Sequence, residues 1–237
     1  MAEPVDDPRP ATSRLRIAVA ALVAVTSVFV GFSAATPVGE AHAAPRQIDI
    51  FEPGPLGPVT VFGDSVLLGS ALWAPTLPDR LAERGWGPIR FRAGEGYNTG
   101  TGDFGARTWL SSWRSQGWDA PNVLVNLGAN DSGVCVTDLR CARDKIQGVI
   151  DEIGPRHTIW WPKITRLPFG GKHYMDAWNG ALDRVVAERD DFFTWDWPTV
   201  MYELGLYSPD HIHQSPSGYR ERSRRMAYEV TAALGRG

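Results

Sequence analysis

The sequence predicts an α/β fold, a three-layer doubly wound domain in which helices cover both faces of a five-stranded parallel sheet. Short apolar runs, typical of buried parallel strands, alternate along the chain with longer segments of helical spacing. This alternation favours βαβ units, because parallel strands need a crossover connection. Small and amide-bearing residues follow three of the apolar runs, as expected where strands end at a ligand-binding edge. We find no internal repeat and expect no second globular domain.

Each expected strand is an apolar or β-branched run that a turn residue ends. The expected strands are residues 59–62, 89–91, 123–127, 158–161 and 192–195. The residues that end them are, in order, Gly63, Gly94, Gly128, Pro162 and Asp196. The third run, Val-Leu-Val-Asn-Leu, is nearly continuous in apolar residues and is typical of a central strand.

The segments between these strands show helical patterns. Trp109 and Trp113 stand four residues apart, which places them on one helix face, and Gly154 with Pro155 ends a helix that runs through Ile146. Residues 176–189 carry an apolar stripe with a period of 3.6 residues. The expected helices are one that begins at Val66, residues 77–84, residues 104–118, the segment through residues 146–153, residues 176–189 and residues 220–234.

Composition excludes some functions. The 237 residues carry a net charge of -3 and no lysine or arginine stripe, so we expect no nucleic-acid partner. The 10 tryptophans are many for this length, and indole faces stack on sugar rings, although core packing is the alternative for each of them. The sequence predicts no oligomeric state.

The first 43 residues read as a secretory signal peptide. Arg14 and Arg16 precede an uncharged apolar run at residues 17–35, and Ala-His-Ala at residues 41–43 offers a cleavage site. The apolar run is also just long enough to cross a bilayer, so an uncleaved membrane anchor is the alternative. Either interpretation places the protein outside the cytoplasm, in the envelope or the medium, with residues 44–58 as an extended lead-in and residues 59–237 as the domain.

The two cysteines agree with export. Cys135 and Cys141 stand six residues apart, and in an oxidising compartment two such thiols most simply form a disulfide. A metal site would need histidine or carboxylate partners at short spacing, and none accompanies them, so we expect no metal.

Gly63-Asp64-Ser65 makes Ser65 a candidate nucleophile, because it follows the first strand and opens a helix. Serine alone is a weak nucleophile, so this hypothesis needs a base, an orienting acid and oxyanion donors. Asp210 and His213 stand three residues apart in a loop near the end of the chain, where one turn can bring the carboxylate to the imidazole. His211 adjoins Asp210, but neighbouring side chains point apart, so His213 is the better base.

Two further loops follow strands and supply amide groups. A glycine-rich loop after residues 89–91 lets backbone N–H groups approach a ligand closely. Asn130 follows the third strand, at the same sheet edge as Ser65, with a turn-forming residue as the structural alternative.

These blocks, in this order and at this spacing, resemble the SGNH, or GDSL, hydrolase family over nearly all of residues 59–234. The resemblance implies a flavodoxin-like sheet, Ser65 as nucleophile, His213 as general base and Asp210 as the orienting acid, with no cofactor. It also implies an oxyanion hole made by the Ser65 N–H, the Asn130 side-chain amide and a loop N–H placed at Gly96, with Gly94 and Gly100 as alternatives. Asp64 and Asp131 are expected to brace loops. More narrowly, residues 63–69, the Asp196-Trp197 pair and the exported cysteine pair resemble those of extracytoplasmic SGNH domains attached to bacterial membrane acyltransferases.

The sequence therefore predicts an exported serine esterase that removes short, acetyl-like acyl groups from an envelope carbohydrate or another small-molecule ester. An acyltransferase that passes the same acyl group to a sugar hydroxyl is the first alternative. A non-catalytic envelope-binding module is the second, since a fold alone does not establish activity.

Overall fold

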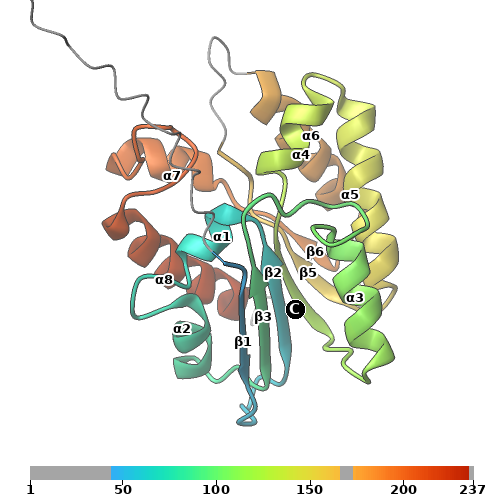
Figure 1. Cartoon of the computed structure of the whole chain (residues 1–237), viewed down its shortest axis with the longest axis vertical. Coiled ribbons are helices and arrows are strands. Elements are labelled where there is room, and N and C mark those ends of the chain that lie inside the picture. Colours follow the sequence, from blue (N-terminus) through green and yellow to red (C-terminus); the bar gives the residue numbers. More distant parts are fainter. Residues whose placement is uncertain (1–43, 166–172, 235–237) are drawn as a thin grey trace, which may run out of the picture. The chain divides into compact units, whose positions relative to one another are not determined.

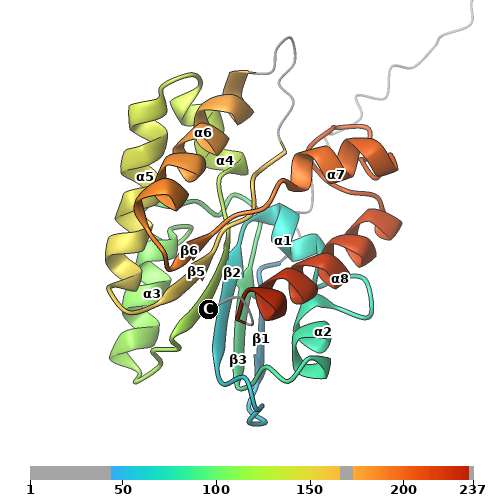
Figure 2. The ribbon, with the colours of Figure 1, turned by 180° about the vertical axis from the view of Figure 1, so that it is seen from behind.

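The computed structural model describes residues 44–165 and 173–234 of the chain. They form a single sheet with helices on both faces, as Figures 1 and 2 show. The expected signal peptide or anchor at residues 1–43 lies outside the described residues. None of the helices in the described ranges is long and apolar enough to cross a membrane.

The sheet has six strands in the order β1-β3-β2-β4-β5-β6. All pairs from β3 to β6 are parallel, and their order is that of flavodoxin-like sheets. The parallel strands are β2 (Val59–Gly63), β3 (Ile89–Ala93), β4 (Asn122–Asn126), β5 (Thr158–Trp160) and β6 (Phe192–Phe193). They lie where the sequence predicted them, and the predicted fold class is confirmed.

The sixth strand, β1 (Arg46–Ile50), was not expected. It pairs antiparallel with β3 at the edge of the sheet, with Ile48 opposite Phe91 and Ile50 opposite Ile89. Its two isoleucines pack against the buried apolar cluster that includes Ile89 and Phe91. A salt bridge of 3.3 Å joins Asp49 to Arg90. The segment expected as an extended lead-in thus contains an edge strand that only tertiary pairing reveals.

The helices divide between the two faces of the sheet (Figures 1 and 2). One face carries α1 (Ser65–Gly69), α2 (Leu77–Glu83) and α8 (Pro216–Ala233), with α7 (Trp197–Leu204) on the same side. The other face carries α3 (Ala106–Ser115), α4 (Ala129–Cys135), α5 (Leu139–Ile153) and α6 (His173–Glu188). The sequence predicted no helix at α4 or α7, because both are short and rich in turn-forming residues or proline.

Strand alternation produces a separate core on each face. Phe62, Val123 and Val125 face α3, α5 and α6, whereas Val61 and Leu124 face α1, α2 and α8. Seven of the ten tryptophans are buried in or beside these cores, so the tryptophan content reflects packing and is not evidence for a sugar site.

The strand register determines where the functional loops meet. Gly63 at the end of β2 lies opposite Ala93 of β3 on one side and Asn126 of β4 on the other. The three loops that follow these strands therefore leave the sheet at the same edge, side by side. The segment after β2 carries Ser65, the segment after β3 is the glycine-rich loop, and the segment after β4 carries Asn130.

Candidate active site

Ser65 is the first residue of α1, directly after the buried strand β2. Asp64 is the N-cap of this helix, and its carboxylate accepts a hydrogen bond of 3.0 Å from the Val66 amide. As the first residue of the helix, Ser65 has no intrahelical partner for its own N–H. Gly69 lets the helix lie directly against Tyr219 of α8, since a Cβ there would come within 2.0 Å of the tyrosine ring.

The structure brings Ser65, His213 and Asp210 together in a hydrogen-bonded series. His213 Nε2 lies 2.8 Å from Ser65 Oγ, and His213 Nδ1 lies 2.6 Å from Asp210 Oδ2. Asp210 Oδ1 also accepts hydrogen bonds of 2.9 Å from the Ile212 and His213 amides. With the proton on Nδ1, Nε2 is an acceptor for the serine hydroxyl.

The carboxylate of this series stays ionised. Partial burial raises the pKa of Asp210, but the hydrogen bonds from the His213 side chain and from the Ile212 and His213 amides outweigh burial, so the pKa is lowered below its ordinary value. An ionised Asp210 stabilises the imidazolium that forms when His213 takes a proton. The ring of His211 lies 6.0 Å from that of Tyr207, and it is His213 that reaches the serine.

The glycine-rich loop follows β3, and the three candidate amides in it have different environments. The Gly94 amide donates to Gly63 O at 3.3 Å, and the Gly100 amide donates to Asn98 Oδ1 at 2.8 Å. The Gly96 amide has no such partner in the part of the chain that the structure describes, and Gly96 adopts a left-handed φ of +71° at an exposed position. Gly96 therefore remains the loop amide that is available to a ligand.

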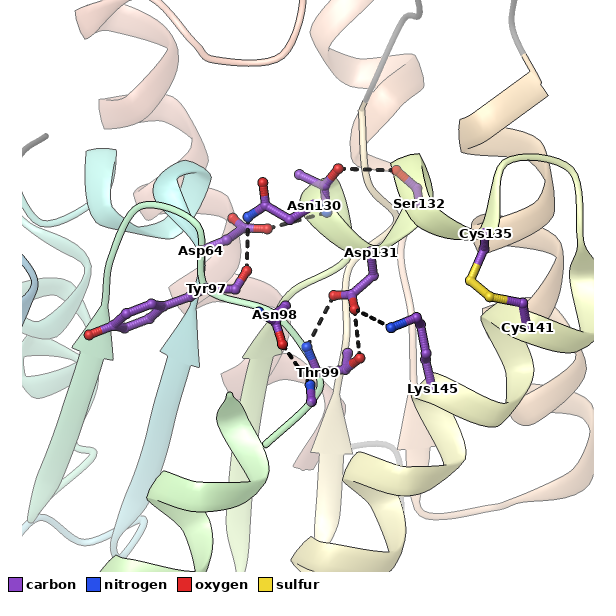
Figure 3. Close-up of polar contacts among 12 residues, drawn as sticks. Asp64, Tyr97, Asn98, Thr99, Asn130, Asp131, Ser132, Cys135, Cys141 and Lys145 are labelled. Carbon is purple, nitrogen blue, oxygen red and sulfur yellow. Dashed lines mark hydrogen bonds and ion pairs between the residues drawn. A yellow bond between two sulfur atoms is a disulfide. The ribbon is translucent and has the colours of Figure 1, made fainter. Parts of the chain in front are cut away.

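Asn130 lies in the first turn of α4 and points toward the glycine-rich loop (Figure 3). Its Nδ2 donates a hydrogen bond of 2.8 Å to the carbonyl of Tyr97, which follows Gly96 directly. A side-chain amide has two N–H groups, so one remains for an incoming oxyanion. Gly128 makes this turn feasible, because its φ is +127° and a Cβ would lie 2.3 Å from the Trp178 indole nitrogen.

Asp131, the next residue, connects α4 to the glycine-rich loop (Figure 3). The carboxylate is buried and accepts hydrogen bonds from the Thr99 amide at 3.1 Å and the Thr99 hydroxyl at 2.8 Å. Lys145 of α5 donates to it at 3.2 Å. Asp131 thus holds the two segments that carry Gly96 and Asn130 in a fixed relation, in keeping with the bracing role expected for it.

Asp64 connects the serine turn to α4 in the same way. Its carboxylate is fully buried and accepts hydrogen bonds from the Val66 amide, from Asn126 Nδ2 at 3.4 Å and from the Ala129 amide at 3.3 Å. Burial raises its pKa to about 6, against the hydrogen bonds from Val66 and Ala129 and the positive charge of Arg222, which lower it.

Sequence reasoning missed Asn126 and Arg222, which lie beneath the serine turn. The guanidinium of Arg222 donates to Asn126 Oδ1, and both side chains are buried. A signal for Arg222 was present, because it shares a buried stripe with Tyr219, Met226 and Val230 on α8. A charged residue on the apolar stripe of a helix is rarely buried without a partner.

The far end of α4 is closed by a disulfide between Cys135 and Cys141, whose Cα atoms are 5.4 Å apart (Figure 3). Cys141 lies in the first turn of α5, so the bond joins the two helices across a short connection. Hydrogen bonds to Asp64 and Asp131 thus fix the start of α4, and the disulfide fixes its end.

This arrangement has the parts that acyl transfer requires. A serine hydroxyl is hydrogen-bonded to an imidazole, which a carboxylate orients, and amide donors converge from two neighbouring loops. The donors lie on elements that buried carboxylates hold in place, so little reorganisation is needed when charge develops on a substrate oxygen.

Comparison with known proteins agrees with this geometry. Solved structures of known proteins share the fold, and three of them are described below. The catalytic domain of peptidoglycan O-acetyltransferase A from Streptococcus pneumoniae is 16% identical, with 78% of this chain and 94% of that chain covered and a TM-score of 0.55. The psychrotrophic esterase EstA from Pseudoalteromonas sp. is 16% identical, with 76% and 99% covered and a TM-score of 0.59. A carbohydrate acetylesterase from Sinorhizobium meliloti is 18% identical, with 74% and 99% covered and a TM-score of 0.50.

Among curated proteins, none matches the chain by sequence. The family model described as GDSL-like Lipase/Acylhydrolase matches residues 61–221, which include the serine turn, the glycine-rich loop, Asn130 and the Asp210–His213 loop. The chain therefore belongs to the GDSL-like lipase/acylhydrolase family of serine hydrolases that act on carboxylic ester bonds.

Proposed function

We propose that this protein is an exported serine esterase that removes short acyl groups from an envelope carbohydrate through an acyl-serine intermediate. The observation that carries the proposal is the unbroken hydrogen-bonded series from Asp210 through His213 to Ser65, with separations of 2.6 Å and 2.8 Å. A non-catalytic binding module on the same fold would not depend on the alignment of these three side chains.

The reaction follows from the atoms in place. Ser65 Oγ attacks the ester carbonyl carbon while His213 Nε2 accepts the serine proton, and the tetrahedral oxyanion binds the N–H groups of Ser65, Gly96 and Asn130. The intermediate collapses, and His213 gives the proton to the leaving alkoxide, which departs as an alcohol. Water then attacks the acyl-serine in the same way, and the carboxylic acid and free Ser65 are released.

The exposure of the base favours hydrolysis over transfer. The side chain of His213 is 37% exposed and that of Asp210 is 46% exposed, so water can reach the imidazole that would activate it. A transferase has to keep water from this intermediate while a sugar hydroxyl binds. The peptidoglycan O-acetyltransferase among the structural neighbours makes transfer the outcome to test alongside hydrolysis.

The aromatic side chains beside the catalytic loop support a carbohydrate substrate. Tyr207 pairs with Gln214 across the hairpin that carries Asp210 and His213, and the Ser208 amide donates to His213 O at 2.9 Å. Tyr202 of α7 is 48% exposed, and its ring lies 4.9 Å from that of Tyr207. The exposed Tyr202, held against the half-buried Tyr207 beside the catalytic loop, offers a face on which a sugar ring can stack.

The disulfide supports export. Cys135 and Cys141 are the only cysteines of the sequence, and a bond between them persists in oxidising compartments but not in the cytoplasm. Cell fractionation, with amino-terminal sequencing of the protein recovered, tests both the compartment and cleavage after Ala43.

The decisive experiment measures hydrolysis of p-nitrophenyl esters of increasing chain length by the full chain. We expect turnover that falls beyond short acyl groups, that Ser65→Ala abolishes and that His213→Ala reduces to a residual level. His211→Ala is the matched control, since it removes a histidine from the same loop without touching Ser65. Loss of activity in both histidine variants, or retention in Ser65→Ala, would contradict the assignment.

The carbohydrate is tested with an acetylated polysaccharide as substrate. Tyr202→Ala should reduce kcat/KM for the polysaccharide at least severalfold and leave kcat/KM for p-nitrophenyl acetate unchanged. The same assay with excess sugar acceptor separates the two acyl acceptors, because transfer yields acylated sugar in place of free acid. Equal effects of Tyr202→Ala on both substrates would remove the support for a sugar.

A further inference from the structure

Arg222 lies in the buried core between α8 and the catalytic edge of the sheet. The side chain is 2% exposed, its guanidinium lies 4.9 Å from the Trp197 ring, and one nitrogen donates to Asn126 Oδ1. Its Nε and Nη1 have no hydrogen-bond partner among the described residues. Burying a cation in this way is costly unless an opposite charge lies nearby, and the fold places Asp64 there.

Asn126 connects these two charges through its side-chain amide. The oxygen accepts from Arg222, which directs the nitrogen toward Asp64 Oδ1 at 3.4 Å. The cation and the anion thus favour the same orientation of one buried amide. The backbone of Asn126 adds a further contact, because its carbonyl accepts from the Asp64 amide at 3.1 Å.

These contacts favour the carboxylate form of Asp64. The groups around its two oxygens are all donors, namely the amides of Val66 and Ala129 and the side chain of Asn126. A protonated Asp64 would set a hydroxyl group among these donors, where its proton has no acceptor, and would weaken at least one of the bonds. The two amides belong to the turn that carries Ser65 and to the start of the helix that carries Asn130.

We propose that Arg222 is a positioning residue of the esterase, which acts through Asn126 to keep Asp64 ionised and thereby holds Ser65 and Asn130 in one geometry. Arg222 touches no reacting atom. This role rests on the proposed function, because it concerns the same serine and the same oxyanion donor.

The charges around Asp64 agree with this role. Burial raises the pKa of Asp64 to about 6, the charge of Arg222 lowers it, and the carboxylate of Asp131 on α4 raises it. Tyr219 on α8 also interacts electrostatically with Asp64. Burial raises the pKa of this phenol to about 12, so it is neutral at working pH. Arg222 is the positive charge in this set.

The test compares the pH dependence of p-nitrophenyl acetate hydrolysis in Arg222→Met and in the wild-type chain. Rates are normalised to the active sites that a serine-reactive phosphonate labels, so that unfolded protein is not counted. We expect the acid limb of kcat/KM to move to higher pH by roughly one unit, as for loss of one nearby opposite charge. At pH values below that limb, kcat should be about tenfold lower than above it, with little change in KM. The contacts that Asp64 loses on protonation act in the transition state.

Two variants separate positioning from packing. Met226→Ala removes a fully buried side chain from the same helix without removing charge, so its acid limb should coincide with that of the wild type. Arg222→Lys keeps a cation and should restore most of the pH profile. Protonation of the general base lowers the rate in all variants alike, so only the displacement between curves is interpreted.

An acid limb in Arg222→Met that coincides with those of wild type and Met226→Ala would overturn the proposal and leave Arg222 a packing residue. A wild-type chain without Ser65-dependent turnover would instead contradict the proposed function. In that case the pH dependence of the free energy of unfolding still tests Arg222. The loss of stability with rising pH should extend to higher pH in Arg222→Met, and an unchanged curve would refute the link to Asp64.

Discussion

Replacing Asp64 with asparagine should change how the stability of the protein depends on pH. The pKa of this carboxyl is about 6 in the fold against 3.8 ordinarily, with burial as the main cause. Each pKa unit corresponds to about 1.4 kcal/mol, so the ionised form of Asp64 lowers the free energy of unfolding at neutral pH by about 3 kcal/mol relative to acidic pH.

The sign follows from proton uptake. Between pH 3.8 and about 6 the folded state holds a proton on Asp64 that the unfolded state has released. Stability from this group is therefore complete below that interval and is lost as the pH rises through about 6. Asparagine does not titrate, so the variant lacks this loss. Glu221 acts in the opposite direction, because hydrogen bonds from Arg224 lower its pKa to about 2, but it does so equally in both proteins.

The measurement is urea unfolding of both proteins at several pH values between 4 and 7.5. We expect the free energy of unfolding of the wild type, minus that of Asp64→Asn, to fall by roughly 2 to 3 kcal/mol across this range. Asp79→Asn is a control on a more exposed carboxylate, which caps α2. A difference between wild type and Asp64→Asn that stays constant with pH would show that Asp64 titrates normally, and the argument from its burial would be wrong.

Three further predictions concern the donors and their supports. Asn130→Ala should lower kcat about 10² to 10³-fold with little change in KM for p-nitrophenyl acetate, as for other oxyanion donors; a loss as complete as that of Ser65→Ala would argue against this role. Asp131→Asn should lower kcat about tenfold and also lower Tm, since it weakens the connection of Thr99 to α4; full activity would show that the loop holds itself. Replacing Cys135 and Cys141 together with serine should lower the free energy of unfolding by about 2 kcal/mol or more while Ser65 still reacts with phosphonate, which calorimetry and labelling measure.

The sheet was predictable because its strands are short apolar runs that differ sharply from their neighbours. The parallel strands β2 to β6 needed only local pattern and turn residues to find. β1 was not predictable, because the run Arg-Gln-Ile-Asp-Ile becomes a strand only when β3 offers its edge. α4 begins with Ala-Asn-Asp-Ser-Gly, a composition that favours a turn, and it is helical because Gly128 and the buried Asp131 fix its start.

The catalytic candidates were visible for a different reason. Asp210 and His213 are close in sequence, and Ser65 follows a strand, so spacing and position alone predict their meeting. Asn126 and Arg222 are 96 residues apart, and no local pattern connects them. Their pairing depends on how α8 packs against the end of β4, which is a property of the tertiary structure.

The carboxylates at this edge of the sheet divide into two kinds, and the division has a physical reason. Asp210 is half exposed and its pKa is lowered, so it is charged at little cost and can stabilise an imidazolium. Asp64 is fully buried, and its charge makes the fold less stable as the pH rises toward neutrality. A hydrophobic residue at Asp64 would avoid that loss, but it would leave the amides of Val66 and Ala129 without an acceptor. The fold is therefore less stable at the pH values at which His213 is an unprotonated base. In return, the distance between the nucleophile and the oxyanion donors is fixed.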